Sequence, residues 1–374
     1  MSLPPEQAAE APFNVGDILA AAVGATFGKT YLHASDIGPA AFAGYLVRIS
    51  PGADFEPRFV AYWSESHHYW DQVNTSVVQS TIQNFSAAKY AELRLPAPPL
   101  ETQCIIANYL DRETARLDAL VAAKERVLGL LAEKRRAVIT RAVTRGLDPR
   151  ARLRDSGIPW LGEIPAHWEA WKLGHVAFVG NGSTPNRDNP EYWTEGVIPW
   201  LNSSVVNQDE VTASDQFVTP TAFRECHLPL VKPGSVLIGI TGQGKTRGSA
   251  VVLSFEATIN QHLAFITPNA NLLNAWFLRW ALFAAYEFLR SISDDAGGTK
   301  GALTCEAVAA LYVPLPPLND QRAIVAHVSS EASKLDALRV ATERTIALIK
   351  ERRAALIAAA VTGRHAPDFA RGSA

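Results

Sequence analysis

The sequence predicts a mixed α+β protein in which two α/β domains, the first of them partial, are separated by two long antiparallel coiled-coil helices. Three observations support this fold class: an internal repeat at a constant offset of 218 positions, a long proline-free segment with a seven-residue apolar period at the end of each copy, and short β-branched runs before it.

The internal repeat is clearest where each domain passes into its helix. The segment PPLETQ at 98–103 recurs as PPLNDQ at 316–321. The same offset relates LDAL at 117–120 to 335–338, AVT at 142–144 to 360–362 and, more weakly, VGDIL at 15–19 to PGSVL at 233–237. The second copy runs from about 155 to 364, whereas the first begins near Phe13 and has no counterpart of 160–231. We therefore expect the first domain to lack about its leading third.

The repeat and the proline strings before each helix set the expected boundaries, because proline ends the preceding element. They are a tail at 1–12, a partial domain at 13–99, a long helix at 100–147, a complete domain at 155–315, a second long helix at 316–364 and a tail at 365–374.

Each long helix carries a heptad stripe that needs a partner. In the first, Leu110, Leu117, Lys124, Leu131 and Val138 stand seven residues apart, and in the second Val328, Leu335, Thr342, Ile349 and Leu356 do so. A helix of about 40 residues is about 60 Å long. Two such helices in one chain can bury each other, and the domain between them turns the chain back. This favours an antiparallel pair, with the stripe leucines and their neighbours as the partner-binding face.

The complete domain alternates strand-like and helical patterns. Strands are predicted at 176–179, 236–240, 250–253 and 263–266, and a core helix at 272–289. The helix contains Arg279 and Glu287 and is shorter than a membrane span requires.

Composition narrows the class of protein. The chain is 48% hydrophobic and 19% charged, which is typical of globular domains, and its net charge of −2 gives no global attraction to nucleic acid. Cys104, Cys226 and Cys305 are too far apart to indicate a disulfide framework or a thiolate metal site. The start has no pattern of a secretion signal, so we expect a cytoplasmic protein.

A series of short motifs in fixed order gives the chain its family resemblance. They are WLGEIP at 160–165 followed by His167 and Trp168, GSTP at 182–185, IPW at 198–200, PGSVL at 233–237, and PLPPL at 314–318 with Gln321 at the start of a long helix. In this order, and with the repeat, the chain resembles the specificity subunits of type I restriction-modification systems, here with a truncated first target recognition domain.

The resemblance implies a non-catalytic subunit for defence against foreign DNA. Two target recognition domains on a helical spacer would read a bipartite site in double-stranded DNA, as dimer spacing fixes half-site spacing in two-fold readers. The helices would bind methyltransferase subunits, two of them, and restriction subunits would join through the complex. S-adenosylmethionine, ATP and Mg would belong to those partners, and this chain would hold no cofactor.

One motif suggests a different class of protein. GITGQGKT at 239–246 matches the phosphate-binding pattern G-x-x-x-x-G-K-[ST]. That pattern requires a helix directly after Thr246, whereas the following residues look like a strand. We therefore favour a hairpin, and a P-loop-like nucleotide-binding protein with a coiled-coil arm is kept as the alternative. A purely structural coiled-coil scaffold is a further alternative.

Candidate DNA contacts are hydrogen-bonding and basic side chains on predicted loops. They are Asn181, Ser183, Thr184, Asn186 and Arg187; Asn202, Ser203 and Ser204; Gln243, Lys245 and Arg247 on the Gly-rich hairpin; Thr299 and Lys300; and Lys29 in the first copy. The asparagines and serines are equally suited to capping turns. No catalytic set is found, and the pair His67-His68 is interpreted as a helix face rather than as metal ligands.

A basic run marks the junction between the first helix and the second domain. It comprises Lys134, Arg135, Arg136, Arg141, Arg145, Arg150, Arg152 and Arg154. Such a run is usually only solvated, but at this junction it is also placed to lie over a DNA spacer.

Overall fold

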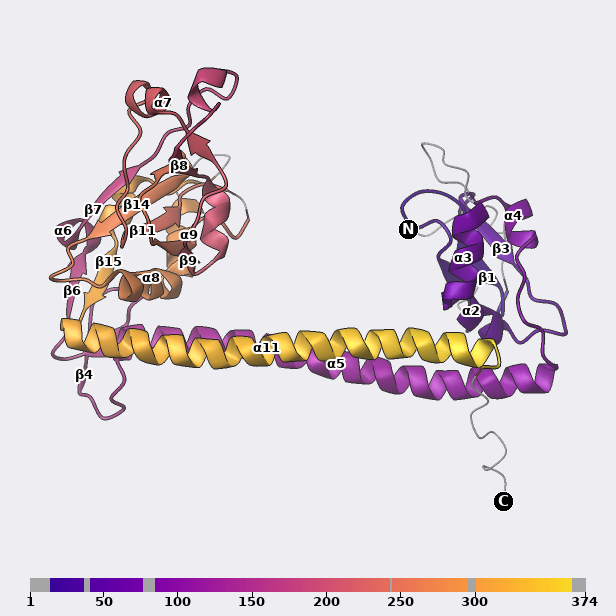
Figure 1. Cartoon of the computed structure of the whole chain (residues 1–374). Coiled ribbons are helices and arrows are strands. Elements are labelled where there is room, and N and C mark those ends of the chain that lie inside the picture. Colours follow the sequence, from indigo (N-terminus) through magenta and orange to yellow (C-terminus); the bar gives the residue numbers. More distant parts are fainter. Residues whose placement is uncertain (1–13, 37–40, 77–84, 243, 295–300, 365–374) are drawn as a thin grey trace. The chain divides into compact units, whose positions relative to one another are not determined.

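The computed structural model describes residues 14–36, 41–76, 85–242, 244–294 and 301–364. The chain divides into two compact units: unit 1 comprises 1–129 with 339–374, and unit 2 comprises 130–338 (Figure 1). Each unit contains part of both long helices, and each is described by itself. The predicted tails at 1–12 and 365–374 lie outside the described residues.

Unit 2 is built on a five-stranded sheet in the order β7-β14-β11-β12-β9. Its strands are β7 (Ala177–Asn181), β9 (Glu210–Val211), β11 (Val236–Gly239), β12 (Ala250–Leu253) and β14 (Leu263–Pro268). All neighbours are antiparallel except β12 and β9. The predicted strands are thus found, each within a few residues of its expected bounds.

Both faces of this sheet are buried, because side chains alternate along each strand. Val236 and Ile238 point into one core, and Leu237 between them points into another. The first core is closed by α8 (Ala275–Ala284) and α9 (Tyr286–Asp294). In Figure 1, α8 lies between the sheet and the long helices. The expected single helix at 272–289 is therefore two helices, which meet at Ala285.

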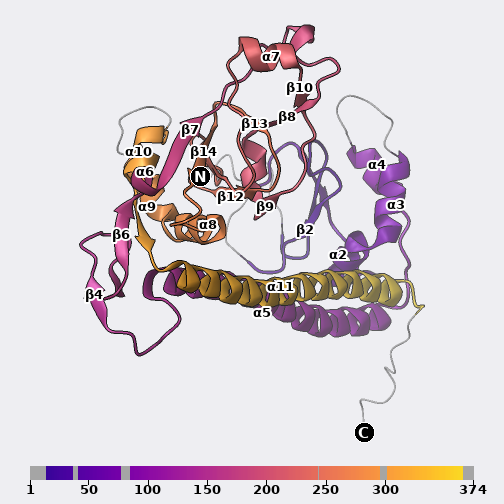
Figure 2. The same ribbon diagram turned by 60° about the vertical axis from the view of Figure 1, so that its left-hand side comes forward.

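The second core lies under a smaller layer that projects at the far end of unit 2. The layer holds a three-stranded sheet, β10-β8-β13. Its elements are β8 (Ile198–Leu201), η2 (Ser203–Asn207), β10 (Phe217–Val218), α7 (Pro220–Glu225) and β13 (Thr258–Ile259). Figure 2 shows α7 beyond β10, on the side away from the long helices.

Shorter elements complete unit 2. They are β4 (Leu153–Asp155) paired with β5 (Glu163–Pro165), β6 (Glu169–Lys172) paired with β15 (Tyr312–Leu315), α6 (Leu173–Val176), η1 (Pro190–Tyr192) and α10 (Cys305–Ala310).

Unit 1 repeats the central part of unit 2 on a smaller scale. Its sheet has the order β2-β1-β3, with β1 (Ile18–Ala21), β2 (Thr30–Leu32) and β3 (Leu46–Ile49), and its helices are α2 (Pro57–Glu65), α3 (His67–Ser76) and α4 (Ala87–Ala91). Phe59 and Trp63 of α2 and Tyr69 of α3 form the core.

The elements of the two units recur at the offset found in the sequence. β1 begins at Ile18 and β11 at Val236, and both form the middle strand of an antiparallel trio. α2 and α8 begin at Pro57 and Ala275, and α5 and α11 begin at Leu100 and Leu318. The members of all three pairs begin 218 positions apart, which is the offset that relates PPLETQ to PPLNDQ.

The long helices α5 (Leu100–Arg145) and α11 (Leu318–Val361) run antiparallel within each unit. In unit 1 the start of α5 packs with the end of α11, so Leu110 shares a core with Ile357. In unit 2 the end of α5 packs with the start of α11, so Val143 shares a core with Val328. The predicted α+β fold with two long antiparallel helices is confirmed. None of the described helices has both the length and the apolar character needed to span a membrane.

Candidate nucleic-acid interface

Three polar loops meet at one end of β8 and β13 in unit 2. Ser183 N donates to Ile259 O at 3.0 Å, and Asn260 N donates to Leu201 O at 2.9 Å. The Thr184 hydroxyl donates to the side-chain oxygen of Gln261. The structure therefore brings together the predicted loops at 181–187 and 202–204, with a third loop at 260–262 between them.

Gly182 permits this close approach. A Cβ atom at this position would lie 1.9 Å from Ile259 O, so any other residue would push the two loops apart.

Several predicted contact residues are engaged in local caps. The Asn186 side chain accepts from Asp188 N at 3.1 Å, and the Asn202 side chain accepts from Ser204 N at 2.9 Å at the start of η2. Asn181 is exposed at the end of β7, Ser203 is half-buried and Ser204 is exposed. The capping interpretation of Asn186 and Asn202 is confirmed, and DNA contact by these residues stays a prediction.

Arg187 is held more firmly than its sequence position indicates. Its guanidinium carbon lies 3.9 Å from the ring centre of Trp193 and 4.6 Å from that of Trp200. Its Nη2 donates to the side-chain oxygen of Gln216 at 2.9 Å. Arg187 is exposed, so this arrangement presents a fixed cation at the surface.

Sequence reasoning missed Gln216, Gln261 and His262. The Nδ1 of His262 is hydrogen-bonded to the Thr241 hydroxyl at 2.8 Å, and this contact joins the third loop to the Gly-rich segment after β11. The polar triplet at 260–262 directly after a short apolar run was a usable signal. No sequence signal pointed to Gln216, because its hydrogen bond with Arg187 forms only in the folded domain.

The Gly-rich segment is a hairpin, so the P-loop alternative is wrong. β11 and β12 pair antiparallel, with Ile238 opposite Ala250, and Gly248 N donates to Gly239 O at 2.8 Å. A phosphate-binding loop needs the N-terminus of a helix at this point, and here a strand follows.

The basic residues of this hairpin differ in exposure. Lys245 is exposed, as predicted. Arg247 is only 1% exposed, which corrects the expectation that it lies at an accessible tip, because the hairpin folds back onto α9 beneath it. Gln243 lies outside the described residues, as do Thr299 and Lys300. Lys29 is exposed in the turn between β1 and β2 of unit 1.

A pocket of about 510 Å³ beside this hairpin contains cations from three elements of unit 2. Arg135 and Arg136 come from α5, Lys245 from the hairpin and Arg279 from α8, and Asp209 faces them. Asp209 pairs with both Arg279 and Arg135, the latter at 3.4 Å. Burial lowers the pKa of Arg279 to about 10, although Asp209 opposes the shift.

Aromatic rings stabilise these cations. The guanidinium of Arg279 lies 3.9 Å from the ring centre of Trp280, and that of Arg135 lies 5.6 Å from the same ring and 5.7 Å from that of Phe283. Part of the basic run therefore joins α5 to α8 and is not simply solvated.

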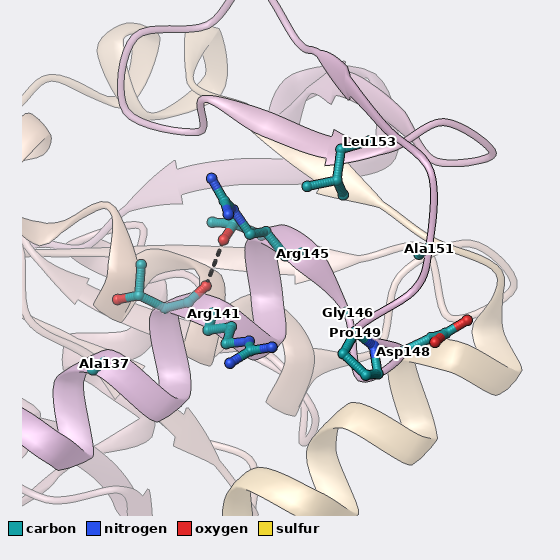
Figure 3. A pocket seen from close by; sticks show the side chains of 10 residues that line it. Ala137, Arg141, Arg145, Gly146, Asp148, Pro149, Ala151 and Leu153 are labelled. Atoms are coloured by element: carbon teal, nitrogen blue, oxygen red, sulfur yellow. Dashed lines mark hydrogen bonds between the residues drawn. The ribbon is translucent and has the colours of Figure 1, made fainter.

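Two further residues of the basic run lie near the end of α5, beside a second pocket of about 520 Å³ (Figure 3). Arg141 and Arg145 line it from the last turns of the helix, and Pro149 and Leu153 line it from the following segment. Arg145 pairs with Glu163 at 3.0 Å. Arg141 is exposed and adds positive charge to this pocket.

The stripe residues of the long helices lie in the seam between the helices. Leu110, Leu117 and Leu335 are buried, and Leu131, Val138, Ile349 and Leu356 are half-buried. The expectation that Leu110, Leu117 and Leu335 form a surface for another subunit is therefore corrected, because other parts of this chain already cover them. Apart from Leu100 at the start of α5, the exposed leucines of the long helices are Leu120 and Leu348 in unit 1, and Leu130 and Leu338 in unit 2.

The fold and these surfaces define a protein of repeated α+β units joined to a pair of antiparallel helices, with polar loops gathered on the larger unit. Comparison with known proteins agrees with this class. Residues 165–346 match the family model described as the type I restriction modification DNA specificity domain.

Curated relatives carry the same description. The chain is 25% identical over 158 residues to the EcoR124I/EcoR124II specificity subunit of Escherichia coli, covering 41% of this chain and 39% of the relative. It is 25% identical over 253 residues to the putative MjaX specificity subunit of Methanocaldococcus jannaschii, covering 67% and 54%. The chain thus matches less than two thirds of the length of these relatives.

Solved structures share the fold. One, from a study of complex assembly and conformational transition of the type I R-M system, has a TM-score of 0.74 at 19% identity and covers 94% of this chain and 82% of that chain. The HsdS subunit from Thermoanaerobacter tengcongensis has a TM-score of 0.54 at 20% identity, covering 95% and 82%. The resemblance seen in the sequence is confirmed by the match of residues 165–346 to the specificity domain and by these relatives.

Proposed function

We propose that this chain is the non-catalytic targeting subunit of a type I restriction-modification complex and that it recognises a specific sequence in double-stranded DNA. The observation that carries the proposal is the match of 165–346 to a DNA specificity domain, together with the polar loops at 181–187, 202–204 and 260–262 that converge in that same unit. Hydrogen-bonding side chains on converging loops are what reading base edges requires.

The cationic side chains would supply the sequence-independent part of binding. Lys245 and Arg141 are exposed in unit 2 and Lys29 is exposed in unit 1. Because each phosphate contact releases counterions, affinity should fall steeply as salt rises. A bipartite target follows if unit 1 contributes its own half-site.

The long helices would dock the methyltransferase subunits. Beyond the first turn of α5, where Leu100 is exposed, each unit exposes one leucine from α5 and one from α11. Leu120 corresponds to Leu338, and Leu130 to Leu348, at the repeat offset. Two equivalent apolar positions suit two copies of one partner. Restriction subunits would join through that complex. S-adenosylmethionine, ATP and Mg would be bound by these partners, and a cytoplasmic location belongs to the same proposal.

The proposal is tested by co-expressing the chain with the methyltransferase subunit encoded beside it. Genome-wide sequencing of methylated adenines should give one sequence motif that is absent from cells with the methyltransferase alone. A purified complex should bind a duplex with that motif more tightly than a scrambled duplex. If no complex forms, or if the two duplexes bind equally, the proposal is wrong.

A further inference from the structure

The loop at 182–197 in unit 2 contains a surface cation that its own fold holds in place. Trp193 donates its indole N–H to Asn186 O at 2.9 Å, and Trp200 donates its indole N–H to Ser183 O at 3.2 Å. The two rings meet edge to face, with centroids 5.2 Å apart and planes at 88°. Both rings are therefore held in place by contacts that do not involve Arg187, and its guanidinium stacks on them.

Gln216 fixes the remaining freedom of the Arg187 side chain. Its side-chain oxygen accepts from Arg187 Nη2 at 2.9 Å. Its backbone is fixed in turn, because Gln216 O accepts from Trp200 N at 2.9 Å and from the Ser214 hydroxyl at 2.7 Å. One N–H of the Arg187 guanidinium thus donates to Gln216, and the other N–H groups of the planar guanidinium can donate to a ligand.

The charge of Arg187 is not neutralised by a carboxylate within the described part of the chain. This distinguishes it from Arg58, which pairs with Glu56 and Asp111, and from Arg353, which pairs with Glu65 and Asp118. Those arginines join elements of the fold. Arg187 is stacked on aromatic rings and hydrogen-bonded to a neutral amide, which orient the guanidinium and leave its charge available.

We propose that Arg187 reads a guanine in the DNA target of this domain. The major-groove edge of guanine presents two acceptors, O6 and N7, and a pre-oriented guanidinium fork matches them in a bidentate contact. Restraint by Trp193, Trp200 and Gln216 lowers the entropy lost on binding, so the contact discriminates well. This inference rests on the proposed DNA-recognition function, and it assigns one base of the recognition sequence to one side chain.

The test uses the purified complex of the full chain with its methyltransferase and a duplex with the methylated motif. Each guanine is replaced in turn by 7-deazaguanine, which lacks the N7 acceptor, and affinity is measured by fluorescence anisotropy. We expect one replacement to weaken wild-type binding by about tenfold and to leave binding by Arg187→Met unchanged, because methionine keeps an unbranched side chain but has no donor for O6 or N7. Gln216→Ala should reduce the effect of the same replacement, and Arg224→Met, at an exposed position on α7, should leave it as in wild type.

Two results would overturn the inference. In one, wild type and Arg187→Met show the same profile over all guanines. In the other, the Arg187 variant binds every duplex more weakly by the same factor and its salt dependence falls, which is the signature of a phosphate contact. Failure of wild type to distinguish the motif from a scrambled duplex would instead reject the proposed function itself.

Discussion

Gln103 and Gln321 make the same three hydrogen bonds in the two units. Each side chain accepts one backbone N–H and donates to two backbone carbonyls, at 2.7–3.0 Å. The partners of Gln103 are Glu56, Asp54 and Pro98, and those of Gln321 are Asn274, Leu272 and Pro316. Every partner is displaced by the same 218 positions as the glutamine itself. This amide thus ties the first turn of each long helix to the proline string before it and to the loop that leads into α2 or α8.

Removing either amide should destabilise its own unit. Gln103 and Gln321 are 1% and 0% exposed, so replacement by alanine leaves buried carbonyls without donors. We expect a loss of about 2–3 kcal/mol in the free energy of unfolding for each variant. Gln321→Glu should lose more, because a carboxylate places an acceptor against the two carbonyls. Denaturant unfolding followed by circular dichroism checks this, with the exposed neighbour variant Arg322→Ala as the control. A stability equal to that of the control would contradict the role assigned to the amide.

The ion pair of Asp209 with Arg279 should matter for the attachment of α8 to α5. The Arg279 side chain is 6% exposed, and Asp209→Asn leaves its charge buried without a counterion. Because Asp209 is itself half-exposed, we expect a moderate loss of about 1–3 kcal/mol in the stability of unit 2. Adding Arg279→Met should restore most of it, because the buried charge is then gone. Chemical unfolding of the single and double variants measures this, with the exposed Asp215→Asn as the control. A single variant as stable as that control would show that Asp209 is dispensable.

Tyr62 should make the stability of unit 1 depend on alkaline pH. Burial raises its pKa to about 12, and the hydrogen bond it donates to Asp111 at 2.7 Å adds to this while the Thr114 hydroxyl opposes it. The folded pKa is above the unfolded value of about 10, so the contribution is fully present below pH 10 and is lost as pH rises through about 12. A phenolate absorbance titration of wild type minus Tyr62→Phe should show one group titrating near 12. In denaturant the same difference should move to about 10, and a native difference already near 10 would contradict the assignment.

Local patterns in the sequence predicted the repeat, the helices and the hairpin because these depend on periodicity and turn chemistry. Gln103 and Gln321 stood out as matching positions before their bonds were visible. The hairpin at 239–250 was predicted because a β-branched run, rather than a helix, follows its glycines. In each case, the residues that decide the structure are close together in the chain.

The burial and aromatic contacts of single side chains could not be predicted from local sequence patterns. Arg247 looks like an exposed tip residue, but the path of α9 beneath the hairpin buries it. The setting of Arg187 depends on Trp193, Trp200 and Gln216, which come together only when β8 and β10 pair. Such contacts join segments through tertiary packing, and sequence spacing carries no signal for them.

The exposed leucines of the long helices should each affect one methyltransferase subunit. Leu120 and Leu348 of unit 1 are 44% and 56% exposed, and Leu130 and Leu338 of unit 2 are 63% and 54% exposed. If each pair docks one copy, charging one pair with glutamate should reduce the bound methyltransferase from two copies to one, and charging both pairs should leave none. Charge in an apolar interface is costly when it has no partner, so the change should appear as lost copies in native mass spectrometry.

A matched control separates docking from general disturbance of the helix. Val340 is 55% exposed on α11, and its repeat equivalent is Ala122, so it has no apolar counterpart of similar size. Val340→Glu should therefore retain both methyltransferase copies. Circular dichroism should show the same helix content for all variants, because the changed positions lie outside the seam between α5 and α11. Retention of two copies by both leucine pair variants would show that docking uses another surface.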